Sequence, residues 1–108
     1  MGGVRFLSPK MVDMMTTNQI PGIYAVSGRG FGLGFETVER FGANNLSSVG
    51  TFSWGGAYAS NYQVDPAEGL TIVFMINQLP NTSDVPTKFS TLVYQALVSP
   101  RAATVIQR

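Results

Sequence analysis

Residues 56–77 read GAYASNYQVDPAEGLTIVFMIN, and this stretch decides the fold. Gly56 to Val64 and Leu70 to Asn77 are predicted to form strands, because each is a short run rich in apolar and aromatic residues. The intervening Asp65-Pro66-Ala67-Glu68-Gly69 is typical of a tight turn, in which proline presets φ and glycine accepts a left-handed conformation. The two strands are therefore expected to pair antiparallel.

The strand predicted at Leu70 to Asn77 is apolar on both faces. Its two sets of alternating side chains are Leu70, Ile72, Phe74, Ile76 and Thr71, Val73, Met75, Asn77. Such a strand is normally buried on both sides. Because only two short helices are predicted, we expect them to be too small to cover both faces well.

A third strand is predicted upstream, at Gly30 to Glu39, where bulky residues alternate with glycine. The face formed by Gly30, Gly32 and Gly34 is bare, which predicts that another element packs close to the backbone there. The same glycines do not match the spacing of a nucleotide-binding GxGxxG loop, and no helical pattern follows them.

Two helices complete the predicted fold. Ser8 and Pro9 are typical of an N-cap and a first helical position, so a helix is expected over Lys10 to Asn18. A second helix, capped by Ser83 or Asp84, is expected over Pro86 to Val98. Its apolar stripe comprises Phe89, Leu92, Val93, Ala96 and Leu97. The prediction is one α+β domain over residues 1–108, with a three-stranded antiparallel sheet, the C-terminal helix on one face and an N-terminal helix.

Composition excludes several classes of function. The chain has 108 residues, 12% of them charged, and a net charge of +1. Its cations are scattered, which argues against a nucleic-acid surface. It has no His and no Cys, which removes imidazole triads, thiolates and the usual zinc sites. No metal or cofactor is expected, and no apolar run approaches the length of a membrane span.

Three segments resemble the end of the serine β-lactamase, D,D-peptidase and esterase superfamily, the penicillin-recognising serine hydrolases. They are Gly3-Val4-Arg5-Phe6-Leu7-Ser8-Pro9-Lys10 with Met14-Met15-Thr16-Thr17-Asn18-Gln19-Ile20-Pro21; Gly30-Phe31-Gly32-Leu33-Gly34-Phe35; and Ser53-Trp54-Gly55-Gly56-Ala57 followed by Val64-Asp65-Pro66 and Leu70-Thr71-Ile72-Val73-Phe74-Met75. Together they span nearly the whole chain, in the family's order. The resemblance implies a β-lactamase-like fold.

The resemblance also implies a site. The family's nucleophile lies in Ser-x-x-Lys and a second motif in Tyr-x-Asn or Ser-x-Asn, both upstream of the matching part, and this chain contains neither Ser-x-x-Lys nor Tyr-x-Asn. Its third motif corresponds to Trp54, Gly55 and Gly56, which would bind substrate. Ala57 would then offer its backbone N–H to the oxyanion. Where relatives carry Lys, Trp54 favours neutral acyl esters over anionic β-lactams.

We therefore expect a C-terminal fragment of a β-lactamase-related serine hydrolase that is inactive alone. The alternative is a non-catalytic binding or self-assembly module built on the same sheet. Without the resemblance, Trp54-Gly55-Gly56 is typical of a turn with an anchoring aromatic residue. A sheet missing its other strands would leave an open edge and an uncovered apolar face, so we expect a homo-oligomer. No membrane or nucleic-acid partner is expected, and the compartment stays undetermined.

Overall fold

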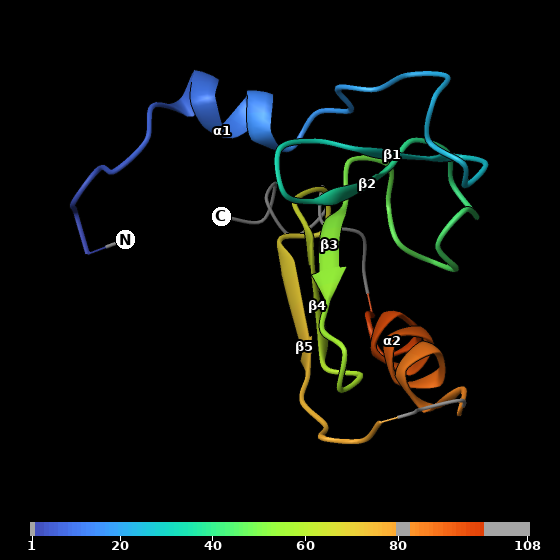
Figure 1. Cartoon of the computed structure of the whole chain (residues 1–108). Helices are drawn as coiled ribbons and strands as arrows, with labels where there is room; N and C mark the ends of the chain where they lie inside the picture. Colours follow the sequence, from blue (N-terminus) through green and yellow to red (C-terminus); the bar gives the residue numbers. More distant parts are fainter. Residues whose placement is uncertain (1, 80–82, 99–108) are drawn as a thin grey trace.

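The computed structural model describes residues 2–79 and 83–98 (Figure 1). Its elements are, in chain order, α1 (Pro9–Met15), β1 (Arg29–Phe31), β2 (Glu36–Val38), β3 (Phe52–Gly55), β4 (Asn61–Asp65), β5 (Leu70–Phe74) and α2 (Val85–Gln95). None of the helices in this part of the chain is long and apolar enough to cross a membrane. Residues 80–82 and the tail from Ser99 lie outside the described residues.

The strands form one antiparallel sheet in the order β1-β2-β3-β4-β5, each paired with its neighbour in sequence. In Figure 1 the longer strands β3, β4 and β5 run side by side, and β1 and β2 cross above them. The α+β class and the antiparallel sheet are therefore confirmed. The predicted number of three strands is wrong, because the sheet has five.

The first error is a hairpin hidden inside the strand predicted at Gly30 to Glu39. Gly32 N–H donates to the Phe35 carbonyl at 2.8 Å and closes a turn with two central residues. The second of them, Gly34, has a φ of 98°, in the left-handed region that glycine adopts without strain. Large and small side chains continue to alternate through this turn, so the sequence pattern of a single strand gave no indication of it.

The second error is a turn inside the strand predicted at Gly56 to Val64. Gly56 N–H donates to the Ser60 carbonyl at 2.8 Å, and Ala59 N–H donates to the Gly56 carbonyl at 3.1 Å. Ala59 takes a φ of 76°, which is uncommon for a residue with a side chain. Because this turn uses neither Asn-Gly nor Asp-Gly, its sequence carries no ordinary turn signal.

The predicted close approach is confirmed at Gly30 and Gly32 but is wrong at Gly34, where an added Cβ would meet nothing within 4 Å. A Cβ added to Gly30 would lie 2.2 Å from Asn18 Cγ, and one added to Gly32 would lie 2.1 Å from the Met15 carbonyl oxygen. The chain after α1 runs along the outer edge of β1, where Gln19 N–H donates to the Phe31 carbonyl at 2.9 Å. Glycine is therefore required at these two positions by packing.

The N-terminal helix begins as predicted and ends earlier than predicted. Ser8 caps it through a 3.2 Å bond from Met11 N–H to the Ser8 hydroxyl. It ends at Met15, not Asn18, because the Met15 carbonyl accepts a bond from Leu33 N–H at 2.9 Å. The Asn18 side chain accepts bonds from Ile20 N–H and Phe31 N–H at 3.0 and 3.2 Å.

Helix α2 packs on one face of the sheet, as predicted (Figure 1). The side chains that face the sheet differ from the predicted set. The residue it buries is Tyr94, whereas Leu92 of the predicted stripe is 62% exposed. Phe89 keeps a contact with Phe74 of β5, with ring centroids 5.4 Å apart. The Tyr94 hydroxyl donates to the buried carboxylate of Asp65. This bond turns Tyr94 toward the sheet, and the apolar stripe is left partly exposed to solvent.

The opposite face of the sheet is much less covered. Ile72 of β5, which faces α2, is 5% exposed, whereas its neighbour Val73 is 54% exposed and Met75 is 83% exposed. The expectation that this strand is buried on both sides is wrong for this chain. The expected uncovered apolar face is present.

Candidate functional site

The third-motif residues lie where β3 leaves its neighbour β2. Strand β2 pairs with β3 only at Glu36–Ser53 and Thr37–Phe52. Trp54 and Gly55 continue β3 beyond that point and pair only with β4, opposite Tyr62 and Asn61. Within the described residues, this end of β3 therefore has an open edge.

The direction of the backbone groups at this edge follows from one hydrogen bond. Gly56 N–H donates to the Ser60 carbonyl at 2.8 Å, which makes Gly56 and Ser60 a hydrogen-bonded pair. Bonded and non-bonded pairs alternate along antiparallel strands, so the next pair, Gly55–Asn61, is non-bonded. The N–H and C=O of Gly55 therefore point away from β4, toward the open edge.

Ala57 lies in the exposed turn between β3 and β4, not in the strand where it was expected. Its N–H has no hydrogen-bond partner among residues 2–79 and 83–98. The Ala57 amide is therefore free to donate to an acceptor from outside these residues.

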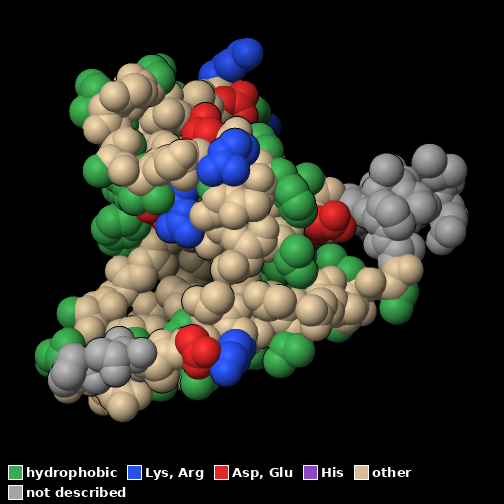
Figure 2. Space-filling model, turned by 90° about the vertical axis from the view of Figure 1, so that its right-hand side faces the viewer, with side chains coloured by type: hydrophobic (Ala, Val, Ile, Leu, Met, Phe, Trp, Pro, Cys, Tyr) green, Lys and Arg blue, Asp and Glu red, His purple; other side chains and the backbone are tan. Residues whose placement is uncertain are grey.

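Two hollows border Trp54 and Gly55. One, of about 290 Å³, is lined mainly by apolar side chains, those of Trp54, Tyr62, Val73, Phe74 and Met75, and also by Gly55, Gly56, Ser60 and Asn61. The other, of about 380 Å³, lies on the side of α2 and has a polar lining that includes Asn44, Asn45, Ser53, Asn61 and Gln63. Figure 2 shows that side of the molecule, with a hollow near its centre. Ala57 lines neither hollow.

Trp54 is half exposed and is held by one aromatic contact. Its ring meets Phe31 of β1 edge to face, with centroids 5.2 Å apart and planes at 86°. Phe31 in turn contacts Tyr24, at 5.9 Å between centroids. The indole is thus positioned by the β1–β2 hairpin, and its exposed fraction of 49% leaves room for contact with a ligand.

The glycines of the motif differ in how tightly they are packed. A Cβ at Gly55 would lie 3.3 Å from the Ser60 carbonyl oxygen, whereas one at Gly56 would lie 3.4 Å from the Ser60 hydroxyl. The first is a tight contact and the second an ordinary one. The chain's own packing therefore tolerates a larger residue at 56 better than at 55.

Comparisons with known proteins identify the family of this chain. The sequence matches the Beta-lactamase family over residues 1–96. The chain belongs to the beta-lactamase family. It is also 36% identical over 97 residues to two proteins of Mycobacterium tuberculosis, Protein Rv1367c of strain H37Rv and the uncharacterized protein MT1414 of strain CDC 1551. These matches cover 75% of this chain and 23% of each relative, so the chain spans about a quarter of their length.

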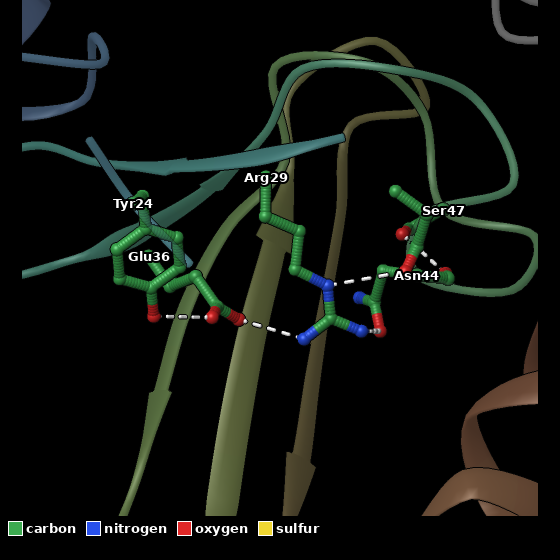
Figure 3. A network of polar contacts seen from close by, with 6 residues as sticks. Tyr24, Arg29, Glu36, Asn44 and Ser47 are labelled. Atoms are coloured by element: carbon green, nitrogen blue, oxygen red, sulfur yellow. Dashed lines mark hydrogen bonds and ion pairs between the residues drawn. The ribbon is translucent and has the colours of Figure 1, made fainter. Parts of the chain in front are cut away.

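One polar network of this beta-lactamase-family chain was not foreseen from the sequence (Figure 3). Arg29 forms an ion pair with Glu36 at 3.0 Å and donates from Nε to the Ala43 carbonyl at 3.1 Å and from Nη2 to Asn44 Oδ1 at 3.2 Å. Tyr24 donates to Glu36 at 2.6 Å. That bond, with burial and the carboxylate charge, raises the pKa of Tyr24. The network joins the hairpin to the loop beside the polar hollow.

A second network is buried around Asp65 at the end of β4. Asp65 Oδ2 accepts a bond from the Tyr94 hydroxyl at 2.6 Å and one from Ser48 N–H at 3.1 Å, and Oδ1 accepts one from Glu68 N–H at 3.2 Å. Burial alone would raise the pKa of Asp65, but these hydrogen bonds outweigh it and lower the pKa. Burial and the Asp65 carboxylate raise the pKa of Tyr94. The Asp65 carboxylate thus joins the end of β4 to the loop before β3 and to helix α2.

The ionisable groups of these networks are engaged with one another. Among residues 2–79 and 83–98, no three side chains of His, Cys, Asp or Glu gather into a metal site. The chemical groups around Trp54, Gly55 and Gly56 are backbone amides, the Trp54 indole and the apolar lining of the adjacent hollow. Such groups bind and polarise a substrate but supply no nucleophile.

Proposed function

We propose that this chain forms one wall of the acyl-transfer site of a beta-lactamase-family serine hydrolase. The observation that carries the proposal is the open end of β3, where Gly55 directs its backbone groups outward and Trp54 is half exposed. In this proposal Trp54, Gly55 and Gly56 bind substrate and Ala57 N–H is one of two oxyanion donors. The nucleophilic Ser belongs to polypeptide outside this sequence.

The division of labour follows from acyl-transfer chemistry. As the nucleophile attacks, the carbonyl oxygen becomes an oxyanion, and donors already aimed at it lower the barrier without reorganising. The free N–H of Ala57 can supply one such donor, while the second would come from the nucleophile's own amide. Losing one donor costs about 10²- to 10³-fold in rate. The chain alone is therefore expected to hydrolyse neither esters nor β-lactams.

The substrate class follows from Trp54. A Lys ammonium at this position would make a charge-assisted contact with an anionic substrate, worth about 1.5–3 kcal/mol, or roughly 10- to 150-fold in affinity. The indole offers an apolar face instead, and the apolar hollow beside it is lined by Tyr62, Val73 and Met75. Both features favour the acyl group of a neutral ester.

The test is a chimera in which this chain replaces the matching segment of a longer family member that carries Ser-x-x-Lys and hydrolyses nitrophenyl esters. Ala57→Pro removes the proposed donor and should lower kcat by about 10²- to 10³-fold. Ala67→Pro is the matched control, since it lies in the exposed turn after β4, where proline suits the first central position. Equal rates for the two variants would refute the oxyanion role.

A second arm tests the substrate class in the same chimera. Trp54→Lys should bind an anionic chromogenic cephalosporin about 10- to 150-fold more tightly than the Trp54 form does, and the neutral ester no more tightly. Faster turnover of the cephalosporin than of a nitrophenyl ester by the Trp54 form would overturn the ester assignment. The oxyanion proposal would survive that result, because it rests on Ala57.

A further inference from the structure

The indole of Trp54 lies at the border between the two hollows. Trp54 lines both the polar hollow and the apolar hollow. The orientation of its ring therefore decides how much room each hollow offers to a substrate. Gly55 also lines both, but it has no side chain that could turn. A residue that fixes the indole would thus set the shape of the proposed acyl site without touching the substrate.

Phe31 is the aromatic residue that contacts the indole. Strand β2 stops pairing with β3 at Ser53, so no residue of β2 is paired with Trp54. The ring of Phe31, from the outer strand β1, meets the indole edge to face instead, with centroids 5.2 Å apart. In the part of the chain that the structure describes, this is the only ring contact of Trp54. Such a pair favours one orientation of the ring by about two- to twelve-fold.

The backbone of Phe31 is fixed on both sides of its strand. Phe31 and Glu36 are partners across the β1–β2 hairpin. On the outer side, Phe31 N–H donates to Asn18 Oδ1 at 3.2 Å and the Phe31 carbonyl accepts a bond from Gln19 N–H at 2.9 Å. The position from which the Phe31 ring reaches the indole is therefore set by the chain after α1 and by β2 together.

Tyr24 links the Phe31 ring to the ion pair of Arg29 and Glu36. The Tyr24 ring contacts Phe31, with centroids 5.9 Å apart, and its hydroxyl donates to Glu36 at 2.6 Å. Figure 3 shows Glu36 between Tyr24 and Arg29, which holds the carboxylate from the other side at 3.0 Å. The Glu36 side chain is only 17% exposed. The Phe31 ring is thus held by a neighbour that is itself anchored to a partly buried carboxylate.

We propose that Phe31 is a positioning residue that fixes the orientation of the Trp54 indole, and that Tyr24 holds Phe31 in turn. Phe31 and Tyr24 line neither hollow, so they act on a substrate through Trp54. A fixed indole keeps the apolar hollow in one shape and presents one surface to the acyl group of an ester. The effect on turnover rests on the acyl-transfer function proposed above, whereas the orientation of the indole is a property of this chain alone.

Spectroscopy of the full chain measures the indole directly, because Trp54 is its only tryptophan. Phe31→Leu keeps an apolar side chain but removes the ring. The amplitude of fast indole motion in time-resolved fluorescence anisotropy should then rise by about two-fold or more, and the near-UV circular dichroism of the indole should weaken. Phe31→Tyr keeps the ring and should retain the wild-type signals. Phe35→Leu is the matched control, since Phe35 lies in the same hairpin and meets Phe52 edge to face at the same 5.2 Å.

The outcomes separate positioning from general loosening of the fold. Unchanged indole signals in Phe31→Leu, or equal changes in Phe31→Leu and Phe35→Leu, overturn the proposal. Exchange of the β4 amides shows whether each variant remains folded. Should Phe31→Leu not fold, Tyr24→Phe decides instead, because it keeps every ring and removes only the hydroxyl that donates to Glu36. Indole motion should increase in this variant too, and an unchanged anisotropy would refute the proposal.

The ester-hydrolysing chimera connects the indole to the substrate. In it, Phe31→Leu should raise KM for a neutral nitrophenyl ester by about two- to twelve-fold and change kcat by less than about two-fold, because the indole contributes to binding. In a Trp54→Ala background the same substitution should leave KM unchanged, since Phe31 acts through the indole. An equal rise of KM in both backgrounds contradicts the positioning role. A chimera in which Ala57→Pro has no effect on kcat would refute the oxyanion role and leave the fluorescence result standing.

Discussion

The close approach at Gly32 leads to a prediction whose magnitude comes from the structure. In Gly32→Ala, the new Cβ would lie 2.1 Å from the Met15 carbonyl oxygen and 3.1 Å from the Thr17 carbonyl oxygen. Both are backbone atoms, so no side chain can rotate to relieve the clash. The chain after α1 must instead move away from β1.

That displacement breaks three hydrogen bonds, from Leu33 N–H to the Met15 carbonyl, from Gln19 N–H to the Phe31 carbonyl and from Phe31 N–H to Asn18. At about 0.5–1.5 kcal/mol each, the loss in the free energy of unfolding is about 1.5–4.5 kcal/mol. Denaturant unfolding of the wild type and the variant measures it. Exchange at the Gln19 and Leu33 amides should accelerate as well.

Gly56→Ala is the control, because its Cβ would meet the Ser60 hydroxyl at an ordinary 3.4 Å. It should cost about 1 kcal/mol or less. If both variants lose the same stability, the packing argument at Gly32 is wrong. A double-mutant cycle with Gly30→Ala and Asn18→Ala extends the test, since the three atoms nearest to a Cβ at 30 all belong to the Asn18 side chain. Truncating Asn18 should then relieve most of the clash, which appears as a large coupling energy.

Three more predictions concern the two polar networks. Tyr94→Phe removes a hydrogen bond to a buried carboxylate, so the free energy of unfolding at neutral pH should fall by about 1.5–3 kcal/mol, as measured in urea. Because the folded pKa of Asp65 lies below its ordinary 3.8, its stabilising contribution is present above pH 3.8 and is lost as the pH falls through the folded pKa. Tyr94→Phe raises that folded pKa, so acid unfolding followed by circular dichroism should begin at a higher pH; an unchanged midpoint would contradict this. Arg29→Lys keeps the charge but not the fork that reaches Ala43 and Asn44, so amides of the 41–50 loop should exchange faster while those of β4 do not change.

The sequence predicts best where a local signal has one structural solution. Asp65-Pro66-Ala67-Glu68-Gly69 specifies a turn, and the hairpin of β4 and β5 follows on either side of it. Ser8 followed by Pro9 specifies the start of α1 in the same way. The bare face of Gly30 and Gly32 predicted a close neighbour but not its identity, because that neighbour is the chain after α1.

The predictions fail where the signal is ambiguous or where the cause is tertiary. The turn at Leu33 and Gly34 preserves side-chain alternation, and the turn at Ala57 to Ala59 lacks the residues that mark hairpins. The orientation of α2 depends on the partner of Tyr94, a carboxylate 29 positions earlier in the chain.

The candidate site was found only through resemblance to a family. Trp54, Gly55 and Gly56 are adjacent in sequence, so their proximity needed no fold. Their position at an open strand edge could not be known without the fold, because it depends on where β2 stops pairing with β3. The ion pair of Arg29 and Glu36 could not be predicted while both were assigned to a single strand. The two residues become diagonal neighbours only because β1 and β2 form a hairpin.

The composition of the interior has a thermodynamic consequence. Among the described residues, the buried apolar side chains are Val38, Ile72 and Tyr94, while the buried polar ones are Thr37, Ser47, Thr51, Gln63 and Asp65. Exposing apolar surface raises the heat capacity on unfolding and exposing polar surface lowers it. Calorimetry should therefore give a heat-capacity increment below the roughly 1.3–1.6 kcal/mol/K expected for a domain of this size. Stability should then vary little between refrigeration and body temperature.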